Sequence, residues 1–449
     1  MDSHATSIDV TEGGLVLARV LAPLKSAVKT PVERGKARPR PAGRPVRPRV
    51  VVVGAGFAGL NAARVLARGG ALVALADPRP YTTFQPLLYQ VATAGINAGD
   101  VAYPLRTFAG NYPNMRVRVS RLSNLHLDDK RVELADGTAI DYDYLVLATG
   151  VTTSWLGIKG AQEHAMPTYS VRDAVALRER IQRCLEETAE GKRSSTHVVI
   201  VGGGATGVET AGVLAELRRR TIPLTHPEIR PEQISVTLVE RFDYVLAPYK
   251  PRLRDAAANA LRKRGVNLRL GSSVAAVEPD AVILGDGTRL HSDVTIWAPG
   301  VIAPKEVADC GLPQGKGGRV IVTEALNLED HPEVFVAGDL ALSPQPLPQV
   351  AQPAIQMGKH VGRQILAAAQ GRPVRPFSYR DPGIMAIVGR AEAVIQLRNG
   401  MTMHGLLPWL AWIFVHIAYL LGGRNRITVL NDFFWRYLGP RHSAASVAE

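Results

Sequence analysis

The sequence predicts an α/β fold with two parallel β-sheets and additional helices at its C-terminal end. Two observations predict the sheets. A strand, a glycine-rich turn, a helix and a second strand follow one another at 49–79, and the same unit recurs at 196–240. Continuous runs of valine and other aliphatic residues are typical of parallel strands covered on both faces. A third observation, the apolar stretch LLPWLAWIFVHIAYLLGG at 406–423, predicts a C-terminal helix of a different character.

Composition narrows the class of protein. The chain has 449 residues, which suits two or three domains, and its 46% hydrophobic and 21% charged residues are typical of a globular protein. The net charge is +13, and residues 1–50 contribute +6 of it, with ten Lys/Arg against four Asp/Glu. A basic balance suits nucleic acid, an anionic membrane surface or anionic ligands. No Arg/aromatic pattern of a nucleic-acid-binding module occurs, so we expect no nucleic-acid partner.

Residues 1–48 form a basic leader. The segment RGKARPRPAGRPVRPR at 34–49 is rich in Pro, Arg and Gly and has no apolar periodicity, which predicts disorder. A polybasic contact with anionic lipid is the alternative interpretation of this leader. No secretory signal is recognisable, and the leader's acidic residues argue against a transit peptide.

The first glycine turn has the spacing of a dinucleotide-binding site, with Gly54, Gly56 and Gly59. The first glycine allows the tight turn, the second lets the backbone approach a pyrophosphate, and the third lets the helix pack closely on the sheet. Free N–H groups and the dipole at the helix N-terminus favour the phosphates. Asp77 ends the second strand, where we expect its carboxylate to accept hydrogen bonds from ribose hydroxyls.

The second turn repeats this arrangement with Gly202, Gly204 and Gly207. Glu240 ends the next strand. A carboxylate there suits the free 2′-hydroxyl of NADH and repels the 2′-phosphate of NADPH. Arg241 follows directly and would soften that preference. Both units are therefore predicted to be Rossmann-like dinucleotide-binding units.

Three further motifs accompany the turns: YLVLATG at 144–150, VTIWAPG at 294–300 and VFVAGD at 334–339. Together they resemble the two-dinucleotide-binding-domain flavoprotein superfamily, in which an NAD-binding domain is inserted into an FAD-binding domain. The resemblance implies FAD at the first turn and NADH at the second. It also implies that Gly338 and Asp339 bind the ribityl and phosphate portion of FAD.

The resemblance gives a domain organisation in four parts. The expected boundaries are a leader at 1–48, an FAD-binding domain at 49–170 and 301–380, an NADH-binding domain at 171–300, and a C-terminal membrane-association region at 381–449.

Cysteine chemistry does not fit this chain. Disulfide reductases of the superfamily need a closely spaced cysteine pair beside the flavin, and peroxidase members need one cysteine shortly after the first unit. Cys184 lies on a predicted polar helix and Cys310 in a late loop, so we expect both to be inert. The chain also lacks C-x-x-C and clustered His or carboxylate motifs, so we expect no metal site.

The electron acceptor is indicated by AQPAIQMG at 351–358. Gln352 and Gln356 are four residues apart and share one helical face, where two amides can hydrogen-bond a carbonyl ligand such as a quinone. With FQPLLYQVATAGI at 84–96 and the apolar–GGRNR–apolar ending, this motif resembles the type II NADH dehydrogenases, which are single-chain NADH:quinone oxidoreductases of respiratory membranes.

The family resemblance implies roles for individual residues. It implies that Gln352 and Gln356 line the quinone site near the flavin, and that Glu209 lies near the nicotinamide. A first-turn acid that favours the helix dipole is the alternative for Glu209. Met357 departs from the family, which often has Gln or Glu at this position. That departure leaves the polarity of the quinone pocket open.

The apolar C-terminal stretch fits a quinone dissolved in lipid. Its length is borderline for spanning a bilayer. Trp409, Trp412 and Trp435 suit the membrane interface, and Arg424 and Arg426 suit lipid headgroups. The segment that follows is predicted to be an amphipathic helix lying in the interface plane. A buried core helix and a homodimer interface are alternatives.

We therefore expect a non-pumping NADH:quinone oxidoreductase with FAD, peripheral on the cytoplasmic face of a bacterial membrane. Hydride passes from nicotinamide to flavin, and the protein supplies orientation and exclusion of water. No residue stands out as proton donor to the quinone. Two alternatives stay open: another quinone-reducing flavoprotein of the same architecture, such as a sulfide:quinone oxidoreductase, and a non-catalytic NADH-binding redox flavoprotein.

Overall fold

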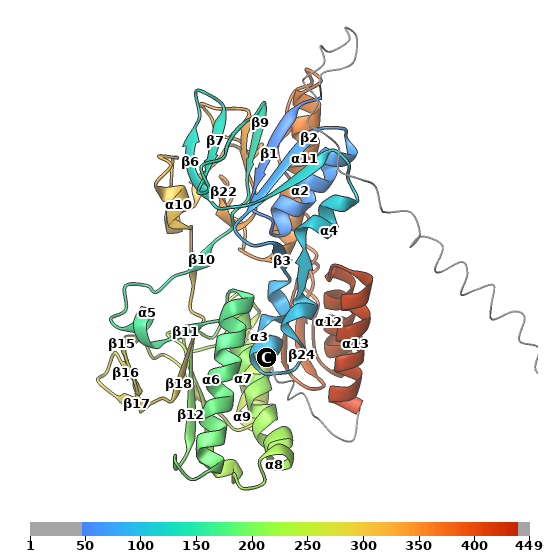
Figure 1. Ribbon diagram of the computed structural model, residues 1–449. Coiled ribbons are helices and arrows are strands. Elements are labelled where there is room, and N and C mark those ends of the chain that lie inside the picture. Colours follow the sequence, from blue (N-terminus) through green and yellow to red (C-terminus); the bar gives the residue numbers. More distant parts are fainter. Residues whose placement is uncertain (1–46, 439–449) are drawn as a thin grey trace, which may run out of the picture. The chain divides into compact units, whose positions relative to one another are not determined.

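Two five-stranded parallel sheets form the framework of the computed structural model, which describes residues 47–438 (Figure 1). The predicted α/β fold with two parallel sheets is confirmed. The prediction for the leader concerns residues that lie almost wholly outside the described range.

The first sheet has the strand order β21-β9-β1-β2-β5, and all its neighbours are parallel. Its central strand β1 is buried from Val50 to Val53, as the valine run predicts. The helix α2, Phe57–Arg68, follows β1 and returns the chain to the edge where β2 begins. The strands are β1 Arg49–Val53, β2 Leu72–Asp77, β5 Met115–Val119, β9 Tyr144–Leu147 and β21 Val334–Val336.

The second sheet repeats this plan with the order β11-β18-β12-β13-β14, again entirely parallel. The helix α7, Ala205–Glu216, follows β12 and continues through a π-helical turn at Leu217–Thr221 into α8, Ile222–Thr225. The strands are β11 Met166–Pro167, β12 Thr196–Val201, β13 Ile234–Val239, β14 Val266–Arg269 and β18 Val294–Trp297.

A small antiparallel meander with an Asp-Gly turn interrupts each sheet in the chain, between β5 and β9 in the first and between β14 and β18 in the second. Gly137 and Gly287 adopt positive φ angles of 79° and 84° in these turns, a conformation that glycine reaches without strain. The meanders are β6 Leu122–His126, β7 Arg131–Leu134 and β8 Ala139–Asp141, and β15 Val274–Glu278, β16 Ala281–Leu284 and β17 Arg289–His291. Short strand pairs also form between β3 Tyr81–Thr83 and β4 Ala102–Pro104, and between β20 Val320–Ile321 and β22 Ala341–Leu342.

The part of the chain built on the first sheet is called the first half below, and the part built on the second sheet the second half. Two chain segments run between these halves. The strand β10, Thr152–Thr153, follows the carboxyl end of β9, and β19, Val301–Ile302, follows the carboxyl end of β18. These strands pair antiparallel, so the chain leaves the first half and returns to it side by side. The carboxyl edges of both sheets therefore meet at this junction.

The helix α11, Ala351–Ala368, packs closely along α2. A Cβ at Gly358 would overlap the backbone of Ala58, and a Cβ at Gly362 would press on Val65. Glycine at these two positions therefore permits the close approach of the helices. The remaining helices are α3 Leu88–Ala92, α4 Leu105–Gly110, α5 Ala161–His164, α6 Val171–Ala189, α9 Pro251–Lys263 and α10 Lys305–Ala308.

The C-terminal part begins with a three-stranded sheet, which packs on α7 and α9. Gly212 of α7 lies so close to the Val388 carbonyl that any side chain would overlap it. Two helices follow, and none of the helices within 47–438 combines the length and apolar character needed to cross a bilayer. The elements are β23 Ile384–Gly389, β24 Glu392–Gln396, β25 Thr402–Gly405, α12 Leu406–Tyr419 and α13 Gly423–Leu438.

The two tryptophans of α12 do not lie at a surface, and our prediction for them was wrong. Trp409 and Trp412 are 8% and 1% exposed and belong to the core, whereas Leu407 and Phe414 are 73% and 75% exposed. Residues 409, 412 and 416 share one helical face and 407, 410 and 414 the opposite one, because both sets follow the i, i+3, i+7 spacing. Trp435 of α13 is 54% exposed, as expected.

Candidate active site

The first glycine turn is buried at Gly54 and Ala55 and accessible only at Gly56. Gly54 has a φ of 99°, and a Cβ there would overlap the Ala148 carbonyl. The space beyond Gly56 is open, so the backbone at this position is free to meet a phosphate. Asp77 is 3% exposed, and its Oδ2 accepts from the N–H of Ala55 at 2.8 Å. The carboxylate therefore fixes the turn, and its contact with ribose stays a prediction.

The second turn has the same geometry but is more open. Gly202 has a φ of 106°, and Gly204 again faces open space. Glu240 directly follows β13 and is only half-buried, and its carboxylate accepts from the N–H groups of Gly203 at 2.6 Å and Phe242 at 3.0 Å. The Arg241 guanidinium stacks on the Phe242 ring at 4.6 Å.

The VFVAGD motif lies where β21 ends in the first sheet, beside the first turn. Gly338 has a φ of 78°, and its Cβ position faces Ala58 of α2. Burial raises the pKa of Asp339 to about 7, against the opposing influence of Arg319. Met357 of α11 is 1% exposed, and its Sδ accepts from the Gly338 N–H at 3.3 Å. Met357 therefore contacts the VFVAGD motif at Gly338. It does not share the helical face of Gln352 and Gln356.

Tyr169 is a half-buried residue at this junction that the sequence did not reveal. Burial raises its pKa to about 12, and the charge of Asp339 adds to that effect. Gln85 hydrogen-bonds the Tyr169 phenol. A Cβ atom added at Gly150 would lie 3.9 Å from the phenol oxygen. The phenol stays protonated at neutral pH and is a hydrogen-bond donor at the meeting edges of the sheets. A single Tyr in a loop carries no motif, so only the structure could find it.

Glu209 is buried in the second half. Burial raises its pKa to about 8, although the Ile387 N–H, at 3.3 Å, and the Trp412 indole favour its charged form. The carboxyl is therefore mostly protonated at pH 7. The predicted position near the nicotinamide stays a prediction.

The predicted quinone residues occupy α11. Gln356 is held in a reciprocal pair of hydrogen bonds with the Arg380 backbone, at 2.9 and 3.0 Å. Gln352 lies one turn earlier and is half-buried. A cavity of about 220 Å³ adjoins this helix, between α2 and the α12–α13 junction. Its lining includes Phe57, Phe84, Ile355, Lys359, Leu420 and Arg426.

A row of aromatic rings runs from the first turn into α12. Phe57 contacts Phe84 edge to face with centroids 5.7 Å apart, and Phe84 contacts His416 at 6.2 Å. His416 stacks on Trp412 at 3.8 Å. Burial lowers the pKa of His416 to about 4, so the imidazole is neutral at pH 7, and its Nδ1–H donates to the Trp412 carbonyl at 2.7 Å. The apolar C-terminal helix therefore completes the interior between the two halves.

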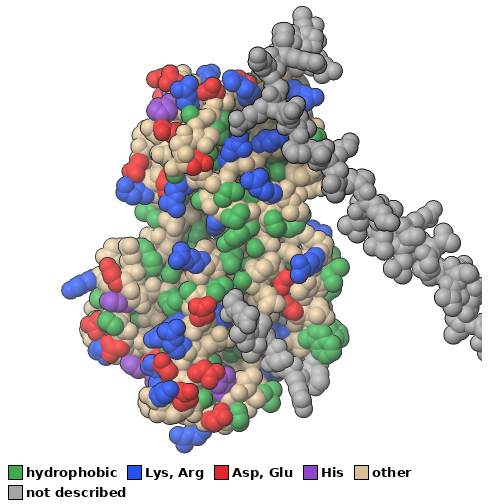
Figure 2. All heavy atoms as spheres, in the orientation of Figure 1, with side chains coloured by type: hydrophobic (Ala, Val, Ile, Leu, Met, Phe, Trp, Pro, Cys, Tyr) green, Lys and Arg blue, Asp and Glu red, His purple; other side chains and the backbone are tan. Residues whose placement is uncertain are grey.

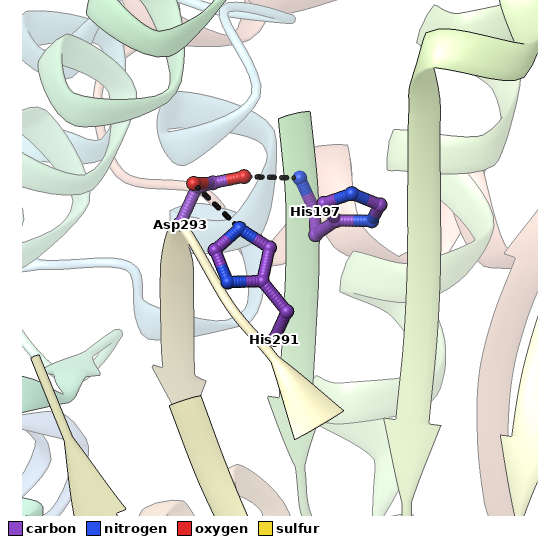
Figure 3. Close-up of side chains that lie close together, drawn as sticks. All are labelled: His197, His291 and Asp293. Carbon is purple, nitrogen blue, oxygen red and sulfur yellow. Dashed lines mark hydrogen bonds and ion pairs between the residues drawn. The ribbon is translucent and has the colours of Figure 1, made fainter. Parts of the chain in front are cut away.

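His197, His291 and Asp293 form a cluster with metal-ligand spacing (Figure 3). The cluster does not suit a metal, because its atoms are committed to other bonds. The ring nitrogens of His197 bond Ser195 and Ser235, at 2.7 and 2.6 Å. Asp293 accepts from the His197 backbone N–H and pairs with Arg193. The cluster fastens the start of β12 to the start of β18.

The cysteines lie away from both turns. Cys184 is fully buried in α6, and Cys310 follows α10 and donates to the Glu306 carbonyl. Burial raises the pKa of both thiols, which disfavours the reactive thiolate.

The geometry is matched by known proteins. A family model described as pyridine nucleotide-disulphide oxidoreductase matches residues 48–358. The chain is 34% identical over 424 residues to the type II NADH:quinone oxidoreductase Ndh of Mycobacterium tuberculosis, covering 90% of this chain and 91% of that protein. The chain belongs to the type II NADH:quinone oxidoreductases.

Further comparisons place the fold within this family. A second type II NADH:quinone oxidoreductase of M. tuberculosis, NdhA, is 36% identical over 411 residues, 87% of this chain and 86% of that protein. Among solved structures, NDH2 of Plasmodium falciparum in complex with NADH has a TM-score of 0.81 at 19% identity, covering 88% of this chain and 100% of that one. A sulfide:quinone oxidoreductase of Aquifex aeolicus has a TM-score of 0.70 at 18% identity, covering 87% and 96%. Likeness at these identities shows the fold alone.

Proposed function

We propose that the protein oxidises NADH with bound FAD and passes the electrons to a quinone in the membrane, without pumping protons. One observation carries this proposal: two dinucleotide-binding turns stand at the carboxyl edges of two parallel sheets, and these edges meet at the β10–β19 junction. Ligands of open α/β sheets bind outside the carboxyl ends of their strands. The two nucleotides would thus meet face to face.

The first half fits FAD. Open space at Gly56 would admit its pyrophosphate, and Gly338 with the Asp339 carboxyl would meet its ribityl portion. When bound, FAD supplies the chemistry that accepts a hydride from NADH and returns electrons to a quinone. The chain's own residues hold the nucleotides in line and exclude water, a task for which the half-buried Tyr169 and the apolar junction are suited.

The second half fits NADH. The Glu240 carboxylate disfavours a 2′-phosphate, and Arg241, stacked on Phe242, is turned to a neighbouring ring. We therefore propose a preference for NADH over NADPH.

We propose the cavity beside α11 as the quinone site. Its lining combines apolar residues such as Phe57, Phe84 and Leu420, which suit a quinone ring and tail, with polar and basic ones. From α11 the cavity is lined by Ile355 and Lys359, whereas Gln352 and Gln356 lie on the same helix outside the lining. Gln356 would also keep the segment around Arg380 in place, through its two backbone hydrogen bonds.

We propose that the exposed faces of α12 and α13 lie on a lipid surface. Leu407, Leu410 and Phe414 of α12 and Ile427, Leu430, Phe434 and Trp435 of α13 are all exposed. Apolar side chains are visible along this edge of the molecule (Figure 2). Arg424 and Arg426 begin α13 and are exposed beside them, which suits anionic headgroups better than a second copy. The cytoplasmic side of a bacterial membrane is the side where NADH is available.

A sulfide:quinone oxidoreductase is the alternative activity, since its fold is similar. It needs cysteines beside the flavin, and neither Cys184 nor Cys310 lies near the first turn. The second turn, with its intact glycines and Glu240, also has no use in that reaction.

The test is an anaerobic titration. The full chain is purified in mild detergent, reduced with NADH and then mixed with a short-chain quinone while flavin absorbance is followed. We expect bleaching by NADH and recovery with quinone. Bleaching without recovery would remove the quinone as acceptor, and no bleaching would remove NADH as donor.

Membrane binding needs a separate test. Sedimentation with vesicles containing anionic lipid should retain the protein, and Phe414→Ser together with Leu430→Ser should release it. Release of the variant with an unchanged oligomeric state supports lipid contact. Retention of the variant, or its conversion from dimer to monomer, would show that this face serves another purpose.

A further inference from the structure

A second cavity, of about 420 Å³, lies between α6, the C-terminal end of α7, α8 and α13. Thr196 and Ile234, the first residues of β12 and β13, contribute to its wall. The second glycine turn follows the opposite end of β12, roughly 17 Å away along the strand. The cavity is therefore separate from the predicted NADH site, and its volume is within the range of small-molecule sites.

The wall of this cavity has an aliphatic part and a polar part, and the polar part includes threonines, His226 and Arg436. Ile181 and Leu185 of α6, Leu214 of α7 and Ile222 of α8 form the aliphatic part. Water is poorly held against this aliphatic part of the wall because it finds too few hydrogen-bond partners there. Hydrocarbon of a ligand would fill this space better.

One buried cation lines the same cavity. Arg178 of α6 is 4% exposed, and its Nε has no hydrogen-bond partner among residues 47–438. The acids of α6 do not pair with it: Glu179 is exposed and Asp173 accepts from the Ser170 N–H. Farther along the helix, Glu186 pairs with His226 and Glu187 with Arg193. A buried charge without a counter-charge is strongly unfavourable, so a guanidinium in this position calls for an anion.

Asp432 of α13 also lines the cavity but forms no ion pair with Arg178 within residues 47–438. Its Oδ2 has no hydrogen-bond partner in the described part of the chain. Burial raises the pKa of Asp432, and the charge of Asp100 adds to the effect, so its charged form is disfavoured. Trp435, from the next turn, forms part of the wall and is 54% exposed on the apolar face of α13.

We propose that this cavity binds a long-chain carboxylate, with its hydrocarbon chain among the aliphatic residues and its carboxylate on the Arg178 guanidinium. A carboxylate matches the planar fork of an arginine through two parallel hydrogen bonds and neutralises its single charge. A neutral quinone would leave that charge uncompensated. The proposal does not depend on the catalytic function, because the cavity lies outside both predicted nucleotide sites.

The test uses tryptophan fluorescence of the FAD-loaded full chain in neutral detergent. A long-chain fatty acid brominated near the middle of its chain is the probe, because bromine quenches nearby tryptophans. We expect saturable quenching that Trp435→Phe largely removes. The methyl ester of the same acid should bind at least tenfold more weakly, since it has no charge for Arg178.

Two matched variants locate the charge. Arg178→Met keeps the side-chain length and should weaken binding of the acid about ten- to a hundredfold. Arg183→Met, on the exposed side of the same helix, should bind as the parent does. Thermal unfolding separates binding from folding: Arg178→Met should melt at the same or a higher temperature, because a buried uncompensated charge is lost, and the acid should stabilise the parent but not this variant.

Three outcomes would overturn the proposal: no saturable quenching, equal affinity for acid and ester, or unchanged affinity in Arg178→Met. Displacement of the acid by an equal concentration of short-chain quinone would also overturn it and assign the cavity to the quinone.

Discussion

The two glycine turns share one backbone design and differ in what surrounds them. The first is covered: α11 packs along its helix and Asp77 is 3% exposed. In the second, Gly204, Ala205 and Thr206 are exposed and Glu240 is half-buried. A bound group that must stay through every turnover suits the covered turn, and a substrate that must leave suits the open one. The same motif can therefore hold a cofactor or release a substrate, depending on its neighbours.

The largest expected difference between the turns comes from their first glycines. Gly54→Ala and Gly202→Ala each place a Cβ against a carbonyl at a positive φ. Gly54→Ala should yield protein without flavin. Gly202→Ala should keep its flavin but lose bleaching by NADH. The ratio of flavin to protein absorbance and anaerobic NADH titration measure both. Equal loss of flavin in the two variants would contradict the assignment of the turns.

The second-largest expected difference between the halves is the pH dependence of stability caused by Glu209. Asn61, which cannot ionise, has the corresponding position after the first glycine turn. The folded-state pKa of Glu209, about 8, lies above the ordinary value of 4.5. The folded protein therefore holds a proton that the unfolded chain releases, and stability falls as pH rises from about 5 to 8. Each pKa unit of difference between the folded and unfolded states corresponds to about 1.4 kcal/mol of folding free energy. Glu209→Gln should remove on the order of 2 kcal/mol of pH dependence between pH 6 and 8.

Denaturant unfolding at several pH values measures this effect. Glu228→Gln, at an exposed acid of the same half, is the control and should keep the parent's pH profile. A profile of Glu209→Gln that matches the parent would show that Glu209 is ionised in the folded protein.

A smaller effect is expected at Glu240. Glu240→Gln keeps an oxygen for the Gly203 N–H but removes the charge that repels a 2′-phosphate. We expect the preference for NADH over NADPH, as the ratio of kcat/KM values, to fall about tenfold. Glu232→Gln, an exposed acid before β13, should leave the ratio unchanged. An unaltered ratio in Glu240→Gln would assign the preference to other residues.

The smallest effect is expected at Gln352. Gln352→Leu should raise the KM for quinone about fivefold, because one neutral hydrogen bond contributes about 1 kcal/mol. The rate of flavin bleaching by NADH should not change. Gln370→Leu, beyond the end of α11, serves as control. A slower NADH half-reaction in Gln352→Leu would move this residue from the quinone site to the flavin.

Local sequence determined much of this fold. The valine runs of β1 and β12, the glycine spacing and the Asp-Gly turns each depend on short stretches of chain, so they could be predicted. The orientation of α12 could not, because both of its faces are apolar and tertiary contacts decide which is buried. Trp412 faces inward since Tyr89 and His416 pack against it.

The site divides in the same way. Residues within motifs, such as Gly54 and Glu240, were found from spacing. Tyr169 and Arg178 were not, and Met357 was linked to the quinone pocket instead of to Gly338, because the contacts of all three involve residues distant in sequence. Met357 supports Gly338 from another helix, and Arg178 stands out only because no acid within residues 47–438 pairs with it.

The β10–β19 pairing has an evolutionary consequence. The chain enters the second half after β10 and returns from it at β19, and these two strands are paired. The two points at which the second half joins the first are therefore adjacent. A segment whose ends lie this close can be gained or lost as a whole without disturbing the host's fold. The second half is thus one continuous segment of chain inserted between β9 and β21 of the first sheet.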